Sequence, residues 1–171
     1  WNLDAEILLN SLNQTVELPE DTSITADANI TDESLVGDLY VPDFETELNI
    51  LVNLDVALSV EPVGQIEATN SLSRDGILAI NGSTQANVLI NAAGFGWLKL
   101  PFNCKTIEPA NFNLAWEGPI AEFGAGGIVF EGETEFSELE CGWMTALFNS
   151  LVAGPGQEYS FRLVPPAPER L

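Results

Sequence analysis

Strict alternation of apolar and polar residues constrains this chain more than any other feature. In the stretch FETELNILVNLDVALSV, Phe44 to Val60, every second residue from Leu48 onward is apolar. Successive side chains of an extended strand point to opposite faces, so this pattern is typical of a strand with one buried and one solvated face. We predict one strand over residues 44–60. Its length of about 55 Å exceeds that of common strands, so we expect a bend or a β-bulge within it.

Similar segments recur between turn signals along the rest of the chain. The turn signals include SRDG at residues 73–76 and NGST at residues 81–84, where Asn-Gly tolerates the backbone of a hairpin turn. We predict further strands at residues 65–72, 77–80, 85–91, 97–102, 112–116, 127–136 and 159–164. A spacing of about ten residues between turns favours a sandwich or a barrel over βαβ units.

The two ends of the chain are harder to assign. WNLDAEILLNSL at residues 1–12 fits either a strand or a short helix, and SITADANIT at residues 23–31 alternates like a strand. We treat residues 1–171 as a single domain, in which residues 1–38 can form an extended N-terminal segment. Residues 165–171 form a Pro-rich tail, because proline excludes both helix and ladder pairing.

The only two cysteines are Cys104 and Cys141, and they lack the CxxC spacing of metal and redox sites. A disulfide between them is the simplest interpretation, and two buried thiols are the alternative. After Cys141, apolar residues at helical spacing (Met144, Leu147, Phe148 and Leu151) predict a helix of two to three turns that ends before Gly154. The overall prediction is an all-β, sandwich-like or barrel-like antiparallel domain with one short C-terminal helix and one disulfide.

Charge limits the range of partners. The chain has 26 acidic residues, five basic residues and no histidine, which gives a formal net charge of -21. Such a surface repels nucleic acid and anionic bilayers. No apolar run is long enough for a transmembrane segment. We expect a secreted or cell-surface protein, and adaptation of an intracellular protein to high salt is the alternative reading of the acidity.

The two cysteine segments also carry a resemblance. CKTIEP at residues 104–109 and CGWMTALFNSLVAGPG at residues 141–156 resemble secreted actinobacterial proteins of unassigned function, which carry a Cys-Lys/Arg-Thr-x-x-Pro segment and a later Cys-Gly-x-x-Thr-x-Leu-x-Asn-x-Leu-x-x-Gly-Pro-Gly segment. The resemblance covers about residues 95–165 and implies export and a cystine-tied β domain. It implies no catalytic residues, and the acidity of residues 1–73 departs from that group.

Two acidic segments are candidates for a divalent cation, calcium being the one cofactor we consider. The first projects three carboxylates from one face of a strand: Glu131, Glu133 and Glu135. The second, DANITDESLVGD, places oxygens at positions 1, 3, 5, 7 and 12 of a calcium-loop template: Asp27, Asn29, Thr31, Glu33 and Asp38. It lacks the glycine at position 6, so a solvated acidic loop is the alternative, as a solvated face is for the three glutamates.

Aromatic residues supply a third candidate site. Trp97, Phe102, Phe112 and Trp116 could line a cavity for a lipid or another apolar ligand. The four tryptophans Trp1, Trp97, Trp116 and Trp143 could form a platform for a surface glycan or line a lipid cavity, although core or rim packing is the commoner role of tryptophan.

Catalysis has little support in the sequence. Without histidine, Ser-His-Asp and Cys-His systems are excluded, and no spacing singles out a pair of carboxylates for hydrolysis. We therefore expect a non-enzymatic structural or adhesive protein of the cell envelope, which could self-associate through strand addition. A module that binds an apolar ligand is the second hypothesis, and a carboxylate-based hydrolase is the third.

Overall fold

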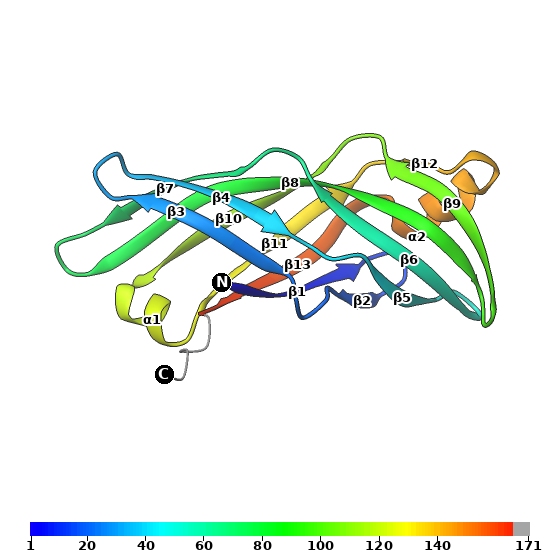
Figure 1. The fold of residues 1–171 in the computed structure, drawn as a ribbon, viewed down its shortest axis with the longest axis horizontal. Helices are drawn as coiled ribbons and strands as arrows, with labels where there is room; N and C mark the ends of the chain where they lie inside the picture. Colours follow the sequence, from blue (N-terminus) through cyan, green and yellow to red (C-terminus); the bar gives the residue numbers. More distant parts are fainter. Residues whose placement is uncertain (166–171) are drawn as a thin grey trace.

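The computed structural model of the protein describes residues 1–165 and consists mainly of antiparallel strands (Figure 1). The strands are β1 (Asn2–Leu9), β2 (Gln14–Glu17), β3 (Ser23–Asn29), β4 (Ser34–Tyr40), β5 (Phe44–Asn49), β6 (Asn53–Pro62), β7 (Ile66–Leu72), β8 (Ile77–Phe95), β9 (Leu98–Thr106), β10 (Ala110–Pro119), β11 (Ile128–Phe136), β12 (Leu139–Glu140) and β13 (Gly154–Val164). The helices are α1 (Ile120–Ala125) and α2 (Thr145–Val152), and a short 3-10 helix, η1 (Gly142–Met144), precedes α2. The predicted all-β antiparallel class with a short helix near the C-terminus is confirmed.

The long strand β8 organises the sheet. Along one of its edges it pairs first with β7 and then with β6, and along the other edge first with β10 and then with β9. The remaining path runs from β7 through β4, β3 and β1 to β13 and β11. As a result, β8 extends along most of the molecule, and its two halves have different neighbours (Figure 1).

The sheet curls so that β11 and β13, at one end of the strand order, approach β10, which pairs with β8. The hydroxyl of Thr134 on β11 donates to the carbonyl oxygen of Asn111 on β10 at 2.7 Å, and the Tyr159 hydroxyl on β13 donates to the Asn113 carbonyl oxygen at 2.8 Å. Tyr159 reaches β10 by crossing Gly132 of β11, where a Cβ atom would collide with the tyrosine ring. These side chains give the sheet its barrel-like closure.

Alternation of buried and exposed residues along the strands produces one continuous core. On β11 the buried positions are Ile128, Phe130, Thr134 and Phe136, while the glutamates between them face solvent. The buried apolar residues of all the major strands and of α2 belong to a single cluster. On β11 the period-two pattern in the sequence therefore separates the inward from the outward face correctly, whereas on β3 only Ile24 of the alternating apolar residues is buried.

The prediction of one strand over residues 44–60 is wrong. The segment is a hairpin in which β5 and β6 pair antiparallel, with Leu48 opposite Leu54 and Asn49 opposite Asn53. Residues 50–52 form the turn. They are Ile-Leu-Val and carry no turn signal, and an odd-numbered turn leaves the alternation intact on both sides.

The predicted turn at Asn81 and Gly82 is also wrong, because β8 continues through both residues. A Cβ atom at Gly82 would collide with Ala68 and with the Glu67 carbonyl oxygen on the neighbouring strand β7. The glycine therefore permits close approach of two strands instead of a chain reversal. The turn at the end of β8 lies later, at Gly96 and Trp97.

The N-terminal residues are part of the sheet. β1 pairs with β13 over Asn2 to Leu8, so the strand alternative at residues 1–12 is confirmed. The amino group of Trp1 donates to the Ile24 carbonyl oxygen at 3.0 Å. Of the predicted Pro-rich tail at residues 165–171, residues 166–171 lie outside the described part of the chain.

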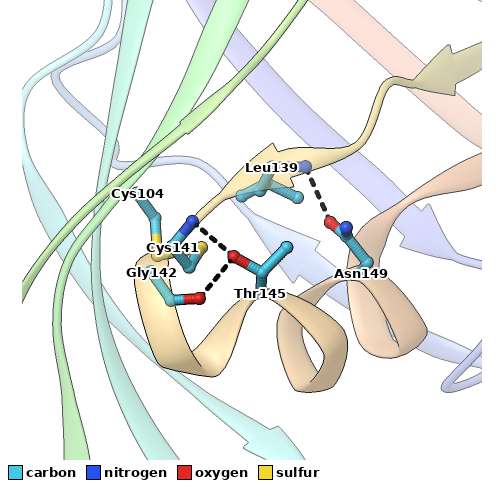
Figure 2. Close-up of a disulfide and its surroundings, with 6 residues drawn as sticks. All are labelled: Cys104, Leu139, Cys141, Gly142, Thr145 and Asn149. Atoms are coloured by element: carbon cyan, nitrogen blue, oxygen red, sulfur yellow. Dashed lines mark hydrogen bonds between the residues drawn. A yellow bond between two sulfur atoms is a disulfide. The ribbon is translucent and has the colours of Figure 1, made fainter.

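The predicted disulfide is confirmed, and it joins β9 to the segment that leads into α2 (Figure 2). Beside it, the Thr145 hydroxyl accepts from the Cys141 amide at 2.9 Å, and the Asn149 side-chain oxygen accepts from the Leu139 amide at 2.7 Å. The helix buries Phe148, Leu151 and Val152. The second helix, α1, was not predicted from the sequence.

None of the helices within residues 1–165 has both the length and the apolar composition that crossing a membrane requires.

Candidate functional site

Two hairpins meet at one end of the molecule. Asp55 of β6 lies opposite Gly94 of β8, so the turn that precedes β6 and the turn that follows β8 project in the same direction. Figure 1 shows both turns at the end of the molecule remote from α1.

The turn between β8 and β9 has only two residues, Gly96 and Trp97, between the paired residues Phe95 and Leu98. Gly96 has a φ of 58°, while Trp97 does not have a positive φ. This combination is a type II′ turn, which requires glycine at its first central position only. The geometry therefore places no demand for an aromatic residue at position 97, and yet the side chain there is a tryptophan that is 94% exposed.

The turn between β5 and β6 consists of Ile50, Leu51 and Val52. Turns favour Gly, Pro, Asn, Asp and Ser, because these residues adopt or stabilise turn conformations. Here all three residues are branched and apolar. Ile50 is half-buried and packs against the core, but Leu51 is fully exposed and Val52 is 56% exposed. The core therefore does not explain the presence of these last two residues.

We call the exposed apolar residues of these two hairpins the apolar end. They are Leu51, Val52, Phe95, Trp97, Leu98 and Leu100. The cross-strand pairs explain how the surface continues past the turns: Phe95 lies opposite Leu98, and Leu100 lies opposite the buried Ala93. Exposed apolar residues gathered at one end of a molecule are candidates for an interaction site.

The segment that carries the β8–β9 turn is free of acids, and the acids of this end lie on β5 and β6. Residues 76–107 include two lysines and no acidic residue, although the chain as a whole carries 26 acids. Lys99 forms an ion pair with Glu45 of β5 at 2.7 Å. The first acids behind the β5–β6 turn are Glu47 and Asp55, which lie opposite each other across the hairpin.

The four aromatic residues predicted to line an apolar cavity do not come together. Phe112 is buried in the core against Tyr159 and Phe161, and the Phe102 ring packs against Phe148 of α2. Trp116 lies opposite Ile80 on β8. Fifteen residues of β8, about 50 Å of strand, separate that position from the turn that carries Trp97.

The interior cavities have other linings and are small. One of about 60 Å³ lies near Trp1 and Phe123, and another of about 50 Å³ lies between β1, β6 and β8. Both are lined by apolar residues. Pockets for small molecules usually measure about 300–1,000 Å³, so neither cavity accommodates a lipid in this conformation.

The structure also shows where the candidate metal ligands lie. Glu131, Glu133 and Glu135 project from the outer face of β11, with Glu133 opposite Glu158 of β13. Among residues 1–165, no group of three or more Asp, Glu, Cys or His side chains converges closely enough to hold a metal ion. The three glutamates thus form part of an exposed acidic face.

The residues predicted to form a calcium loop belong to the β3–β4 hairpin instead. The Asn29 side-chain oxygen accepts from the Thr31 amide at 2.9 Å, and its side-chain nitrogen donates to Asp32 at 2.7 Å. These hydrogen bonds stabilise the turn. Asp27 and Asp38 lie on the two strands, and Glu33 adopts a positive φ of 53° at the end of the turn.

Three hollows on the outer surface are acidic. Their volumes are about 500, 360 and 530 Å³, and their linings include, respectively, Glu131 with Glu133, Glu17 with Glu20, and Glu108 with Glu135. They lie open on the faces of the sheet. A carboxylate hydrolase needs two acids held across a bound sugar.

Comparison of the chain with protein families, with curated proteins and with solved structures finds no match. The resemblance to secreted actinobacterial proteins therefore stays a prediction, and the function has to be argued from the surface chemistry.

Sequence reasoning singled out Trp97 but missed Leu51 and Val52, because they fell inside a predicted strand. One signal in the sequence could have identified them: the triplet Ile-Leu-Val stands between two asparagines in LNILVNL, and each asparagine can end a strand. The absence of acids from residues 76–107 in so acidic a chain points to the other turn, which carries Trp97.

Proposed function

We propose that this protein is a non-catalytic, exported β domain of the cell envelope that attaches to an apolar surface through its apolar end. The observation that carries the proposal is the exposure of Leu51 and Trp97 at adjacent hairpin turns, 103% and 94% respectively. Neither turn geometry nor core packing requires these residues, so their chemistry is available for binding.

Energetics support this reading. Moving a large apolar side chain from water to an apolar environment is worth about 1.5–3 kcal/mol. Leu51 and Trp97 gain none of this stabilisation in the isolated fold, because they are exposed. Contact with an apolar surface would recover it, and the neighbouring Phe95 and Leu98 would add to the buried area.

Several features support a role outside the reducing cytosol and outside catalysis. The Cys104–Cys141 disulfide fits an oxidising compartment and occupies both thiols. The chain contains no histidine, and its carboxylates lie on open sheet faces. Attachment through exposed turns needs none of these groups to react.

Strand addition through the N-terminus does not enter the proposal. β1 is hydrogen-bonded to β13 along most of its length and also pairs with β2. The N-terminal strand is therefore engaged in its own sheet, and adhesion is assigned to the apolar end instead.

The test is adsorption to an apolar matrix. We expect the protein to be retained on octyl-agarose in moderate salt, and the double variant Leu51→Asn/Trp97→Ser to elute early. The matched control is Ile30→Asn/Tyr40→Ser, which makes similar changes at residues that are 75% and 60% exposed in the β3–β4 region. Equal retention of the wild type and the Leu51/Trp97 variant would show that the apolar end does not direct attachment.

A further inference from the structure

The shape and the charge of the apolar end indicate what it binds. Resting on the proposed function, we propose that this end docks onto an electrically neutral lipid bilayer, with the turns at Leu51 and Trp97 inserted at the level between headgroups and acyl chains.

The distance from the two turns to the nearest charged residues matches insertion at the boundary between headgroups and acyl chains. Asp55 is the third residue of β6, about 7 Å of strand beyond Asn53, and Lys99 follows Trp97 by two residues, also about 7 Å. Interfacial elements bury their apolar side about 5–10 Å into the boundary between headgroups and acyl chains. Insertion to that depth would bury Leu51 and Val52 while Glu47 and Asp55 stay in contact with water.

The residues at the turns suit an interface. Tryptophan is favoured where one side of a ring meets hydrocarbon and its N–H meets water or headgroups. Trp97 lies at the apex of its turn with Phe95 and Leu98 directly behind it. A fluid bilayer accepts such a projection without a preformed pocket of matching shape.

Charge selects neutral lipids over anionic ones. The whole chain has a net charge of -21, and the acids nearest to the turn, Glu47 and Asp55, would lie beside the headgroups. An anionic surface would repel them, and salt would weaken the repulsion. Lys99 does not reverse this preference, because its charge is paired with that of Glu45.

A second copy of the chain is a poorer occupant. In an end-to-end dimer, Glu47 and Asp55 of two copies that each carry a net charge of -21 would approach each other. The three surface hollows described above offer no apolar alternative, because they are lined by acids such as Glu131, Glu17 and Glu108. Placing an indole ring in such a hollow would desolvate carboxylates without a partner for their charge.

The experiment is flotation of the oxidised protein with phosphatidylcholine vesicles. Burial of one large apolar side chain changes an equilibrium constant by roughly ten- to a hundredfold. We therefore expect Leu51→Asn/Trp97→Ser to lower the partition coefficient at least about tenfold, and the control Ile30→Asn/Tyr40→Ser to leave it unchanged. The single variants Leu51→Asn and Trp97→Ser should each give a smaller loss. Far-ultraviolet circular dichroism confirms that each variant is folded.

A second series replaces about a third of the phosphatidylcholine with phosphatidylserine. We expect weaker binding in low salt and partial recovery in 0.5 M NaCl, because the salt screens the repulsion. Stronger binding to the anionic vesicles would overturn the assignment of a neutral bilayer.

Other outcomes separate this inference from the proposed function. If octyl-agarose retains the wild type but not the Leu51/Trp97 variant, while vesicles bind neither, the function stands and the bilayer is wrong. A dimer in light scattering that the same variant abolishes would identify a second copy as the occupant. Equal retention of the wild type and the Leu51/Trp97 variant on octyl-agarose would contradict the proposed function itself.

Discussion

Removing the disulfide should destabilise the fold by an amount that follows from the chain length between the cysteines. The perturbation is Cys104→Ala together with Cys141→Ala. The two residues are 37 positions apart, and closing a loop of this length is worth about 4 kcal/mol in the chain-entropy model. Both side chains are buried, at 0% and 6% exposure, so the missing sulfur atoms add about 1 kcal/mol for the cavities they leave.

The expected loss of about 5 kcal/mol is large for a domain whose total stability is about 5–15 kcal/mol. The assay is urea unfolding followed by tryptophan fluorescence and far-ultraviolet circular dichroism. Three samples are compared: the oxidised protein, the same protein with a reductant, and the double alanine variant. We expect the reduced protein and the variant to unfold at similar urea concentrations, well below the oxidised protein.

A loss of less than about 2 kcal/mol would refute this reasoning. It would mean that residues 104–141 are already constrained in the unfolded chain, so that the cystine removes little conformational freedom. A loss in the variant that greatly exceeds the loss on reduction would instead place the stabilisation in packing around the sulfur atoms.

Three further changes test the fold. Tyr159→Phe should lower the free energy of unfolding by about 1 kcal/mol at neutral pH. Burial raises the pKa of the Tyr159 hydroxyl above 10.0, so the unfolded chain deprotonates first and the wild type should lose stability as the pH rises past about 10. The variant should lose less stability over this range in a pH series of urea midpoints. Glu133→Gln should raise the melting temperature in low salt but not in 0.5 M NaCl, because Glu133 lies opposite Glu158. Asn149→Ala should cost about 1–3 kcal/mol in urea unfolding by leaving the Leu139 amide unpaired, whereas Asn149→Asp should cost less.

The sequence allowed prediction of those features of the fold that depend on local pattern. Alternation located strands at β11 and β13 and placed Glu131, Glu133 and Glu135 on one face of β11. Helical spacing identified the buried Phe148 and Leu151 of α2, and the count of two cysteines indicated the disulfide. Each of these follows from side-chain periodicity or from simple chemistry, which neighbours in space do not alter.

Features that depend on contacts distant in sequence could not be predicted. Asn81-Gly82 looks like a hairpin turn, but β7 lies so close that only glycine fits within the strand. The role of Gly132 is hidden in the same way, because its missing side chain makes room for Tyr159. The sequence alone does not distinguish a glycine that allows close approach of two strands from a glycine that allows a turn.

The candidate site was predicted in part. Trp97 was recognised as a residue for apolar contact, but with Phe102, Phe112 and Trp116 as its neighbours instead of Leu51. The true grouping depends on the pairing of β6 with β8, which brings the two turns to one end. That pairing joins residues 24 to 39 positions apart, and no local pattern reports it.

The most direct test of the apolar end as the attachment surface is quenching of tryptophan fluorescence by phosphatidylcholine that is brominated near the top of its acyl chains. We predict that the vesicles quench the wild type and the Trp116→Phe variant, and that Trp97→Phe abolishes most of the quenching. Trp116 is the suitable control because it is partly buried and remote from the apolar end. Quenching that persists in Trp97→Phe, or disappears in Trp116→Phe, would contradict the account.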